Sequence, residues 1–342
     1  MRNSYKYRCK TCGTPMVKAG KNSTGKQRYK CNHCNTRAVV KNENLKRRNE
    51  MKLFVKWVTD STKVSDKVGV SRRTFYRKTN WCWDVIPKIK SEEISSDFIF
   101  VDATYLDRDL CLLIVRNKDY VLGFRWAKSE TYEDYYELLK PLREPHFVIC
   151  DGHSSIIKAV RKLWKNVGIQ RCLVHIIHHA ERKLGKRSPC EVNHIFRKHI
   201  GKLGAVNTVK KAKNWFGKFE HLYEAHQDFI EEKTPRIDLE TGEVLSLYRA
   251  HQNLFSVCNM IRKLQKNNML FLFIENAIPN NSNHLEGGIN SPLKNLLRCH
   301  RGISSEHQMR MFEWYLLSRS NTSINDFINS IDFDDPYPKN GN

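Results

Sequence analysis

The pattern of hydrophobic and polar positions changes near residue 97. Apolar residues are sparse over residues 1–42, so this segment cannot build much of a core of its own. Residues 45–60 carry apolar side chains at helical spacing and predict an amphipathic helix. Beyond residue 97, residues 98–101 form a continuous apolar run, which is typical of a strand that is buried on both faces.

The run at 98–101 opens a regular succession of elements. Further strands are predicted at 110–115, 120–126, 146–150 and 169–173, with helices at 131–142 and 154–164. Three strands in series, followed by alternating helix and strand, predict a mixed sheet with helices packed on it. Mostly helical patterns follow over 176–267, around one possible hairpin at 240–243, and return over 284–318. The predicted fold class is therefore multidomain α+β.

The charge of the chain is high and unevenly distributed. The 342 residues carry a formal net charge of +23, and residues 1–97 hold 24 Lys and Arg against 8 Asp and Glu. A strongly basic segment favours a polyanionic partner, because Lys and Arg displace condensed counterions from a phosphate backbone. We expect no membrane association, since no apolar run reaches the ~18 residues that a spanning helix needs, and the start lacks a signal peptide.

Eleven cysteines include two closely spaced pairs, Cys9 with Cys12 and Cys31 with Cys34, which are separated by 18 residues. Two C-x2-C steps at this separation are typical of a four-cysteine zinc site, in which both thiolates of a step reach one tetrahedral ion. Bound Zn²⁺ would supply folding free energy that the sparse apolar content cannot. The remaining cysteines are scattered and odd in number, which favours a reducing, cytoplasmic location.

The predicted zinc ribbon also carries basic residues interleaved with tyrosines. Such a surface suits nucleic acid, although a protein-binding role for the ribbon remains open. The residues expected to contact DNA here are Lys26, Arg28 and Lys30.

Residues 62–77 have the pattern of a helix-turn-helix. Gly69 permits the turn between the helices, and Ser71 is placed to cap the second helix. An ordinary helical hairpin is the alternative. The residues expected to reach phosphates or base edges in the major groove are Arg72, Arg73, Thr74 and Arg77.

Two aspartates follow predicted buried strands. Asp102 comes after the run 98–101, and Asp151 comes after the strand 146–150. Carboxylates at the ends of neighbouring strands could share a pair of Mg²⁺ ions that bridge phosphate oxygens. The alternatives are a plain turn at Asp151, and Asp107 or Asp109 in place of Asp102, although these two lie in a predicted turn.

A third acid, Glu286, stands three residues after Asn283. This spacing also fits a helix capping box, but two glycines directly after Glu286 disfavour a plain helix and favour a site. Between the acids, Cys172 and His175 form a C-x2-H step that we interpret as site-shaping or DNA-contacting. A plain buried cysteine with a surface histidine is the alternative, and a second zinc site would need His178 and His179 as further ligands.

Taken together, these motifs resemble a known family. The segments Val101-Asp102-Ala103-Thr104, Cys150-Asp151-Gly152, Cys172-x2-His175 and Asn283-x2-Glu286 occur in the order found in Mutator-like DDE transposases. The resemblance spans roughly residues 5–320 and is strongest to bacterial insertion-sequence members with an N-terminal zinc-binding module.

The resemblance implies an RNase H-like core in which Asp102, Asp151 and Glu286 bind two Mg²⁺ or Mn²⁺ ions. It also implies double-stranded DNA as the partner: nicking at the terminal inverted repeats, then attack of the freed 3′-OH on target DNA. A homodimer or higher oligomer on DNA, associated with the nucleoid, is implied as well. The predicted domains are a zinc ribbon at 1–42, a helix-turn-helix domain at 43–92, a catalytic core at 93–176 and 277–325, a mainly helical insertion at 177–276 and a tail at 326–342.

Two other functions stay open from the sequence. One is a sequence-specific DNA-binding regulator with a non-catalytic RNase H-like domain, although a regulator would not need three acids in this order. The other is a nuclease that cuts DNA but never joins it.

Overall fold

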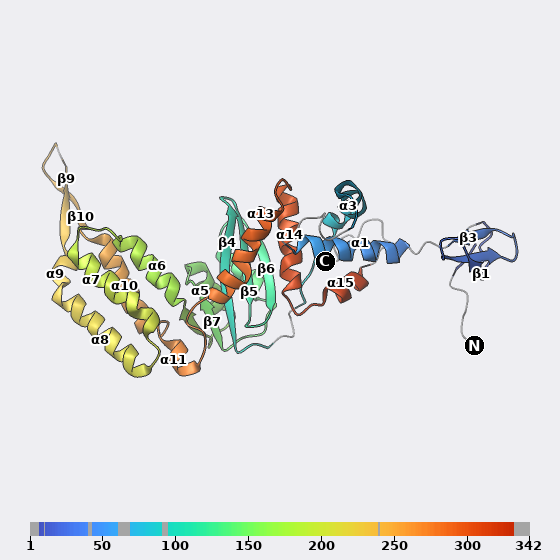
Figure 1. The fold of residues 1–342 in the computed structure, drawn as a ribbon. Helices are drawn as coiled ribbons and strands as arrows, with labels where there is room; N and C mark the ends of the chain where they lie inside the picture. Colours follow the sequence, from blue (N-terminus) through green and yellow to red (C-terminus); the bar gives the residue numbers. More distant parts are fainter. Residues whose placement is uncertain are drawn as a thin grey trace. The chain divides into compact units, whose positions relative to one another are not determined.

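The structure is a computed structural model that describes residues 7–9, 11–39, 43–60, 69–90, 95–238 and 240–331 (Figure 1). The chain divides into two compact units. One contains the N-terminal segments up to residue 57, with 69–85 and 325–331, and the other contains 58–60 and 86–324. Each unit is described separately below.

The first unit begins with a small three-stranded antiparallel sheet. Its strands are β1 (Met16–Lys21), β2 (Gln27–Cys31) and β3 (Arg37–Val39), in the order β1-β2-β3. Among the residues of this segment that the structure describes, Cys9, Met16 and Cys31 form its buried cluster. A module with so few buried side chains needs another source of stability, as the sequence predicted.

The helices of the first unit pack through aromatic rings. They are α1 (Glu43–Val58), α3 (Arg72–Thr79), the 3₁₀ helix η1 (Asn80–Asp84) and most of α15 (Ile324–Ser330). The ring of Trp57 lies 5.1 Å from that of Phe75, and Phe54 lies 4.7 Å from Trp83, both edge to face. The helix predicted at 45–60 is confirmed.

The second unit is built on a five-stranded mixed sheet. Its strands are β4 (Phe98–Asp107), β5 (Leu110–Arg116), β6 (Val121–Ala127), β7 (Phe147–Cys150) and β8 (Gly168–Arg171). They lie in the order β6-β5-β4-β7-β8, with β4, β5 and β6 antiparallel to one another and β7 and β8 parallel to β4. The predicted mixed sheet is confirmed.

One expectation about this sheet is wrong. Asp102 was expected to follow its strand, but β4 continues to Asp107, and Asp102 pairs with Ile114 inside the ladder. The reason is that β5 keeps hydrogen-bonding to β4 well beyond the apolar run, so the strand outlasts its hydrophobic signal. Asp102 is therefore held by its pairing with β5, whereas the ladder between β4 and β7 ends one residue before it.

The two faces of the sheet are covered differently. Ile99, Val101 and Leu113 belong to one large core shared with α4 (Tyr132–Leu139) and α5 (Ser154–Leu163). α14 (Ser305–Ser318) packs on β6, where the ring of Phe312 stacks on Trp126. The predicted cap of α4 is confirmed, because the Thr131 hydroxyl accepts a hydrogen bond from the backbone N–H of Asp134.

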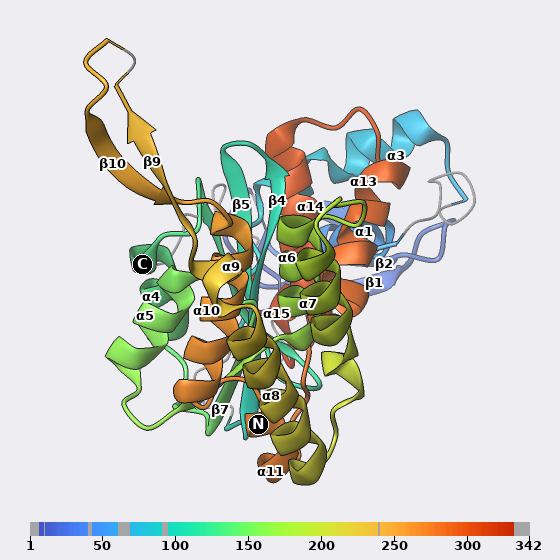
Figure 2. The same cartoon turned by 90° about the vertical axis from the view of Figure 1, so that its left-hand side faces the viewer.

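Residues 173–276 are mainly helical and continue the same core (Figure 2). The elements are α6 (Leu173–Leu184), α7 (Glu191–Gly201), η2 (Lys202–Ala205), α8 (Val209–Ala225), α9 (Gln227–Glu231), β9 (Lys233–Ile237), β10 (Val244–Arg249), α10 (Gln252–Lys266) and α11 (Leu272–Asn276). The predicted hairpin is confirmed as the antiparallel pair β9–β10, which projects away from the helices in Figures 1 and 2.

The chain returns to the sheet edge through the fully buried side chain of Gln170 in β8. Its amide nitrogen donates to the carbonyl of Leu270, and its amide oxygen accepts from the backbone N–H of Phe273. The chain then forms α12 (Asn283–Leu285), the π-helical turn η3 (Glu286–Asn290) and α13 (Ser291–Cys299). Within the described residues, every helix is too short or too polar to span a membrane.

Candidate active site and metal centre

The four paired cysteines converge on one point. Their ligand atoms all lie within 4.8 Å of one another, and the Sγ atoms of Cys9 and Cys34 are 3.4 Å apart. A tetrahedral zinc with sulfur ligands at about 2.3 Å would hold its sulfurs about 3.8 Å apart. The cluster can therefore hold a metal ion, and its donor set of four thiols suits Zn²⁺.

The thiols of this cluster do not ionise alike. The side chain and backbone amide of Thr14 lower the pKa of Cys12 to about 5. The pKa of Cys31 is raised to about 11, because burial and the neighbouring thiols outweigh the favourable Cys34 backbone amide. Four adjacent thiolates repel one another, and a divalent cation in their centre would relieve this repulsion.

Asp102 and Asp151 lie next to each other at one end of the β4–β7 ladder. Val101 pairs with Cys150 as the last pair of that ladder, Asp102 continues β4, and Asp151 is the first residue of the loop after β7. Burial raises the pKa of Asp102 to about 7, and the charge of Asp151 adds to this effect. The structure thus brings the two predicted aspartates into electrostatic contact.

The loop after β7 fixes the Asp151 carboxylate. Oδ1 of Asp151 accepts a 2.8 Å hydrogen bond from the backbone N–H of His153, and Gly152 between them has a φ of +80°. The expected turn at Asp151 is therefore present, and it holds the carboxylate rather than competing with a ligand role.

Arg171 is a neighbour of Asp151 that the sequence did not point to. It ends β8, pairs with Cys150, and lays its guanidinium across Gly152 so closely that a Cβ there would lie 1.9 Å from Nε. Nη1 of Arg171 donates to the carbonyl of Gly152 at 3.4 Å, while Nε is buried with no hydrogen-bond acceptor in the described part of the chain. A cation thus stands beside the aspartates. The glycine that makes room for it was the available signal.

The C-x2-H step lies at the start of α6, where Cys172 is the N-cap residue. The hydrogen bond with Cys172 raises the pKa of His175 to about 9, and the charges of Asp102 and Asp151 add to it. Burial opposes ionisation of Cys172, but hydrogen bonds with His175 and Ser282 outweigh it and lower its pKa. His175 is thus a protonated, half-buried group facing the aspartates.

No second zinc site forms around this step. Among the residues that the structure describes, the N-terminal cysteines are the only group of three or more ligands close enough to share a metal ion.

Glu286 is connected to this cluster through Ser282. Sγ of Cys172 accepts a 3.3 Å hydrogen bond from the Ser282 backbone N–H, and the Ser282 hydroxyl lies 3.4 Å from Nδ1 of His175. One turn later, the backbone N–H of Glu286 donates to the carbonyl of Ser282 at 3.2 Å. The helix of Glu286 is therefore anchored on the C-x2-H step.

The side chain of Glu286 itself is exposed, at the start of the π-helical turn η3. Across the described residues, the three acids do not gather within metal-ligand distance of one another. The expected capping-box alternative is not formed, because the N-cap residue of α12 is Ser282 and no side chain caps the helix. A Cβ at Gly288 would lie 3.1 Å from Nη1 of Arg116, so η3 runs close to the end of β5.

Glu130, in the loop before α4, is a further acid that the sequence did not point to. Its carboxylate accepts a 2.7 Å hydrogen bond from the Tyr135 hydroxyl and lies 3.9 Å from Nδ1 of His153. Its charge also contributes to the raised pKa of Asp102. Through His153, Glu130 supports the loop that carries Asp151.

Residues 117–268 match the family model described as "Transposase, Mutator family". This part of the chain is therefore similar to Mutator-family transposases. The predicted resemblance to this family is confirmed. The matched segment contains Asp151, Cys172 and His175, whereas Asp102 and Glu286 lie on either side of it.

Two relatives support the same assignment. The transposase for insertion sequence element IS256 in transposon Tn4001 of Staphylococcus aureus, and the protein of the same description from Enterococcus faecalis, are each 32% identical over 99 residues. The match covers 28% of this chain and 25% of each relative. This chain is therefore aligned with about a quarter of the length of the curated relatives it matches.

Outside the segment that matches Mutator-family transposases, several of the side chains predicted to contact DNA are exposed. Arg73 and Arg77 are exposed on α3, and Lys26 and Arg28 are exposed on β2 or just before it. Thr74, however, is engaged in the predicted cap. Its N–H donates to the Ser71 hydroxyl, which in turn donates to the Thr74 hydroxyl.

Two other predicted DNA contacts, Arg72 and Lys30, lie in different surroundings. The guanidinium of Arg72 lies 5.5 Å from the ring of Tyr76, and Lys30 is only partly exposed. The first helix of the predicted helix-turn-helix lies outside the described residues, but Gly69 has a φ of +60°, as the predicted turn requires.

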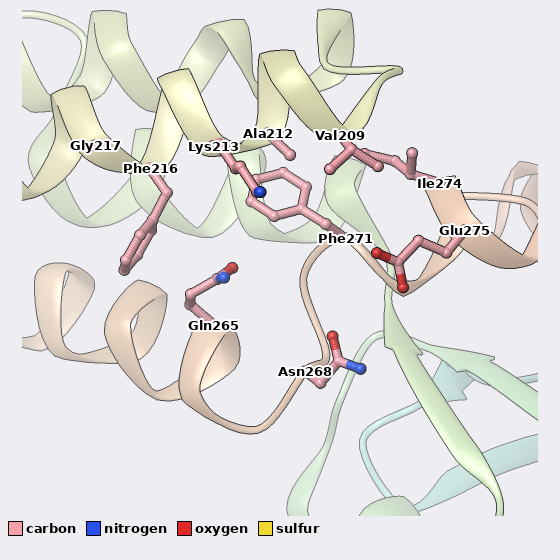
Figure 3. A pocket seen from close by; sticks show the side chains of 10 residues that line it. All are labelled: Val209, Ala212, Lys213, Phe216, Gly217, Gln265, Asn268, Phe271, Ile274 and Glu275. Atoms are coloured by element: carbon pink, nitrogen blue, oxygen red, sulfur yellow. The ribbon is translucent and has the colours of Figure 1, made fainter.

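A cavity of about 340 Å³ lies between α8, α10 and α11 (Figure 3). Phe216, Phe271 and the amides of Gln265 and Asn268 line it. None of the predicted acids lines this cavity, so it takes no part in the chemistry proposed below.

Proposed function

We propose that this protein is a DNA transposase that cleaves DNA strands at element ends and joins the freed 3′-OH to target DNA. The observation that carries the proposal is that Asp102 and Asp151 come directly after Val101 and Cys150, the last paired residues of the parallel strands β4 and β7, and that Asp151 falls in the segment that matches Mutator-family transposases. The whole-protein activity, its DNA substrate and its assembly on DNA as a dimer or higher oligomer are part of this proposal.

The arrangement of the second unit supports an RNase H-like core. Three antiparallel strands are followed by two parallel ones, in the order β6-β5-β4-β7-β8, with helices on both faces. The proposed core comprises residues 93–176 and 277–325, and residues 177–276 form the insertion. The N-terminal cysteine cluster, as a zinc ribbon, and a helix-turn-helix that includes α3 would bind the element ends. We place the protein in the cytoplasm, at the nucleoid.

The charges around Asp102 suit divalent cations. The pKa of Asp102 is raised because a second carboxylate and a low-dielectric surrounding disfavour its ionised form, and cations would relieve both. Asp102 and Asp151 would hold two Mg²⁺ or Mn²⁺ ions, with Glu286 completing the ligand set. When bound, such ions activate the attacking oxygen and stabilise the leaving oxygen of a phosphodiester.

Glu286 must approach the aspartates for this role. The hydrogen bond from its backbone N–H to Ser282 fixes the position of the Glu286 backbone. Glu286 also begins a π-helical turn, a conformation that is often found at functional sites. We propose that binding of DNA and cations draws the exposed carboxylate inward. His175 and Arg171, both cationic beside the aspartates, would hold phosphate oxygens during the reaction.

The proposed chemistry has two steps. Attack of water on a phosphodiester at the element end breaks the P–O3′ bond and leaves a 3′-OH, whose proton comes from solvent. That hydroxyl then attacks a phosphorus atom of target DNA, a new P–O bond forms, and the target strand's own 3′ oxygen leaves. The second step exchanges one phosphodiester for another and needs no further energy source.

The test is cleavage and joining by the full chain on DNA that bears the element's own ends, with and without Mg²⁺. We expect Asp102→Asn to abolish both products while DNA binding stays close to the wild-type level. Asp109→Asn, at an exposed turn of the same hairpin, is the matched control and should keep both. Cleavage by the Asp102 variant at the wild-type rate would remove Asp102 from the site.

The same assay separates the alternatives. Nicked DNA without joined products would identify a nuclease that does not transfer strands. Tight, sequence-selective binding with neither product, from a protein whose zinc content and folding are intact, would identify a DNA-binding regulator.

A further inference from the structure

We propose that the β9–β10 hairpin is a self-association surface, through which the open edge of β10 pairs antiparallel with β10 of a second copy of this chain. The proposal does not rest on catalysis by the acid site. It concerns a part of the molecule that the proposed chemistry leaves unused.

The hairpin is apolar and uncovered. Five of its large hydrophobic side chains are between 50% and 61% exposed: Ile237, Val244, Leu245, Leu247 and Tyr248. They make up half of the large hydrophobic side chains that are exposed in the described part of the chain. Scattered exposed apolar residues are ordinary, but a concentration on one projecting element marks an interaction site.

Neither face of the hairpin is buried. Alternate residues of a strand point to opposite faces, and here Leu247 on one face is as exposed as Tyr248 on the other. A lone two-stranded hairpin is marginally stable in water, because it lacks further strands or a helix to pack on. Strands from a second copy would supply the packing that this hairpin lacks.

The two outer edges differ in their capacity to accept another strand. β9 contains Pro235, which has no backbone N–H and blocks regular pairing at its edge. β10 contains no proline over Val244–Arg249, and after an irregularity between Val244 and Ser246 it pairs in regular register up to Arg249, so its outer backbone groups form a regular edge there. β10 is therefore the edge that can pair with another strand.

The charges along the hairpin favour a second copy in the antiparallel direction. Acidic residues gather at the tip: Asp238, Glu240 and Glu243. Lys233 and Arg249 pair with each other at the base of the hairpin, whereas Arg236 lies nearer the tip, opposite Ser246. A two-fold axis at the middle of β10 would set Glu243 of each tip beside the partner's Arg249, so this part of the surface complements itself.

The same charges disfavour DNA as the occupant. The chain as a whole carries +23, and a DNA-binding arm would be expected to present basic residues at its end. Here the tip is acidic, and it would be repelled by phosphates. The aliphatic residues likewise offer no groups for phosphate contact.

A symmetric pairing fixes the register. With the two-fold axis at Ser246, Leu245 lies opposite the partner's Leu247, and Glu243 lies opposite the partner's Arg249. Aliphatic side chains then meet on one face of the joined sheet, and opposite charges meet at its ends. The two hairpins would form a four-stranded sheet.

The test is sedimentation of the full, zinc-loaded chain over a range of concentrations, without DNA. We expect reversible dimers of the wild type. The double variant Leu245→Lys/Leu247→Lys should associate at least about tenfold more weakly, because it places two charges on each half of the interface. Both side chains are exposed, so its thermal unfolding and zinc content should match the wild type.

Leu45→Lys is the matched control, since it changes a leucine of similar exposure, 53%, on α1. It should leave association unchanged, as should Asp102→Asn, whose failure in the cleavage assay concerns catalysis alone. Glu243→Lys should weaken association, and added salt should weaken it in the wild type.

Three results would overturn the proposal. The first is a wild-type protein that stays monomeric at every concentration. The second is a lysine double variant that dimerises as well as the wild type. The third is a double variant whose affinity for DNA falls while its sedimentation is unchanged, which would make DNA the occupant of the hairpin.

Discussion

The free-energy cost of ionising the buried Asp102 carboxyl can be measured without any DNA. The pKa of its carboxyl is raised from an ordinary 3.8 to about 7, first by burial and then by Asp151. An acid whose pKa is raised on folding binds more protons in the folded state than in the unfolded state. The free energy of unfolding therefore falls as the pH rises from about 4 to about 7, and the loss persists above pH 7.

The size of this loss follows from the two pKa values. Raising the pKa from 3.8 to about 7 corresponds to about 4 kcal/mol between the two protonation states. Because the Asp102 side chain keeps some contact with water, we take about 4 kcal/mol as an upper limit. Asp102→Asn keeps the shape and removes the charge. The variant should be more stable than the wild type at pH 8, and equal to it near pH 4.

The assay is urea unfolding of both proteins, followed by tryptophan fluorescence at several pH values. Divalent cations are removed by dialysis rather than by a chelator, since a chelator would also strip the cysteine cluster. Mg²⁺ added at pH 8 should then stabilise the wild type and not the variant. Asp109→Asn is the control. A difference between Asp102→Asn and wild type that is the same at pH 5 and pH 8 would refute the reasoning.

Three further outcomes are expected. Gly152→Ala should lower the free energy of unfolding by more than Gly185→Ala. Both positions have positive φ, so alanine costs about 1–2 kcal/mol in backbone strain at each, but only at Gly152 would the new Cβ also displace Arg171. Equal losses in urea titrations would contradict this. Ser71→Ala should destabilise α3 by about 1 kcal/mol and weaken DNA binding, as seen by helical circular dichroism and gel shift; unchanged binding would separate α3 from DNA recognition. Cys31→Ser should lower bound zinc, measured by atomic absorption, and full zinc content would argue against the ribbon.

Local rules predicted much of the fold. Apolar runs gave the strands, and hydroxyl caps were correctly expected at Ser71 and Thr131. The same rules ended the β4 strand too early, because the apolar run stops before the backbone pairing does. Where a carboxylate sits relative to a strand end depends on the partner strand, which local sequence does not contain.

The candidate site was predictable in part for a related reason. Asp102 and Asp151 stand out because each adjoins a buried strand, whereas Arg171 and Ser282 act through contacts with residues distant in the chain. No spacing rule announces such contacts. The exposed position of Glu286 was also not predictable, since a π-helical turn depends on how the following helix packs.

The buried amide of Gln170 has a wider consequence. By hydrogen-bonding to Leu270 and Phe273, it ties the chain leaving the sheet to the chain coming back, although about a hundred residues separate them. The backbone N–H groups of Arg171 and Leu173 close the same junction by donating to the carbonyls of Met269 and Asn280. Where Glu286 re-enters beside the sheet is therefore set at this junction, and the exposed β9–β10 hairpin could be shortened or exchanged without disturbing it.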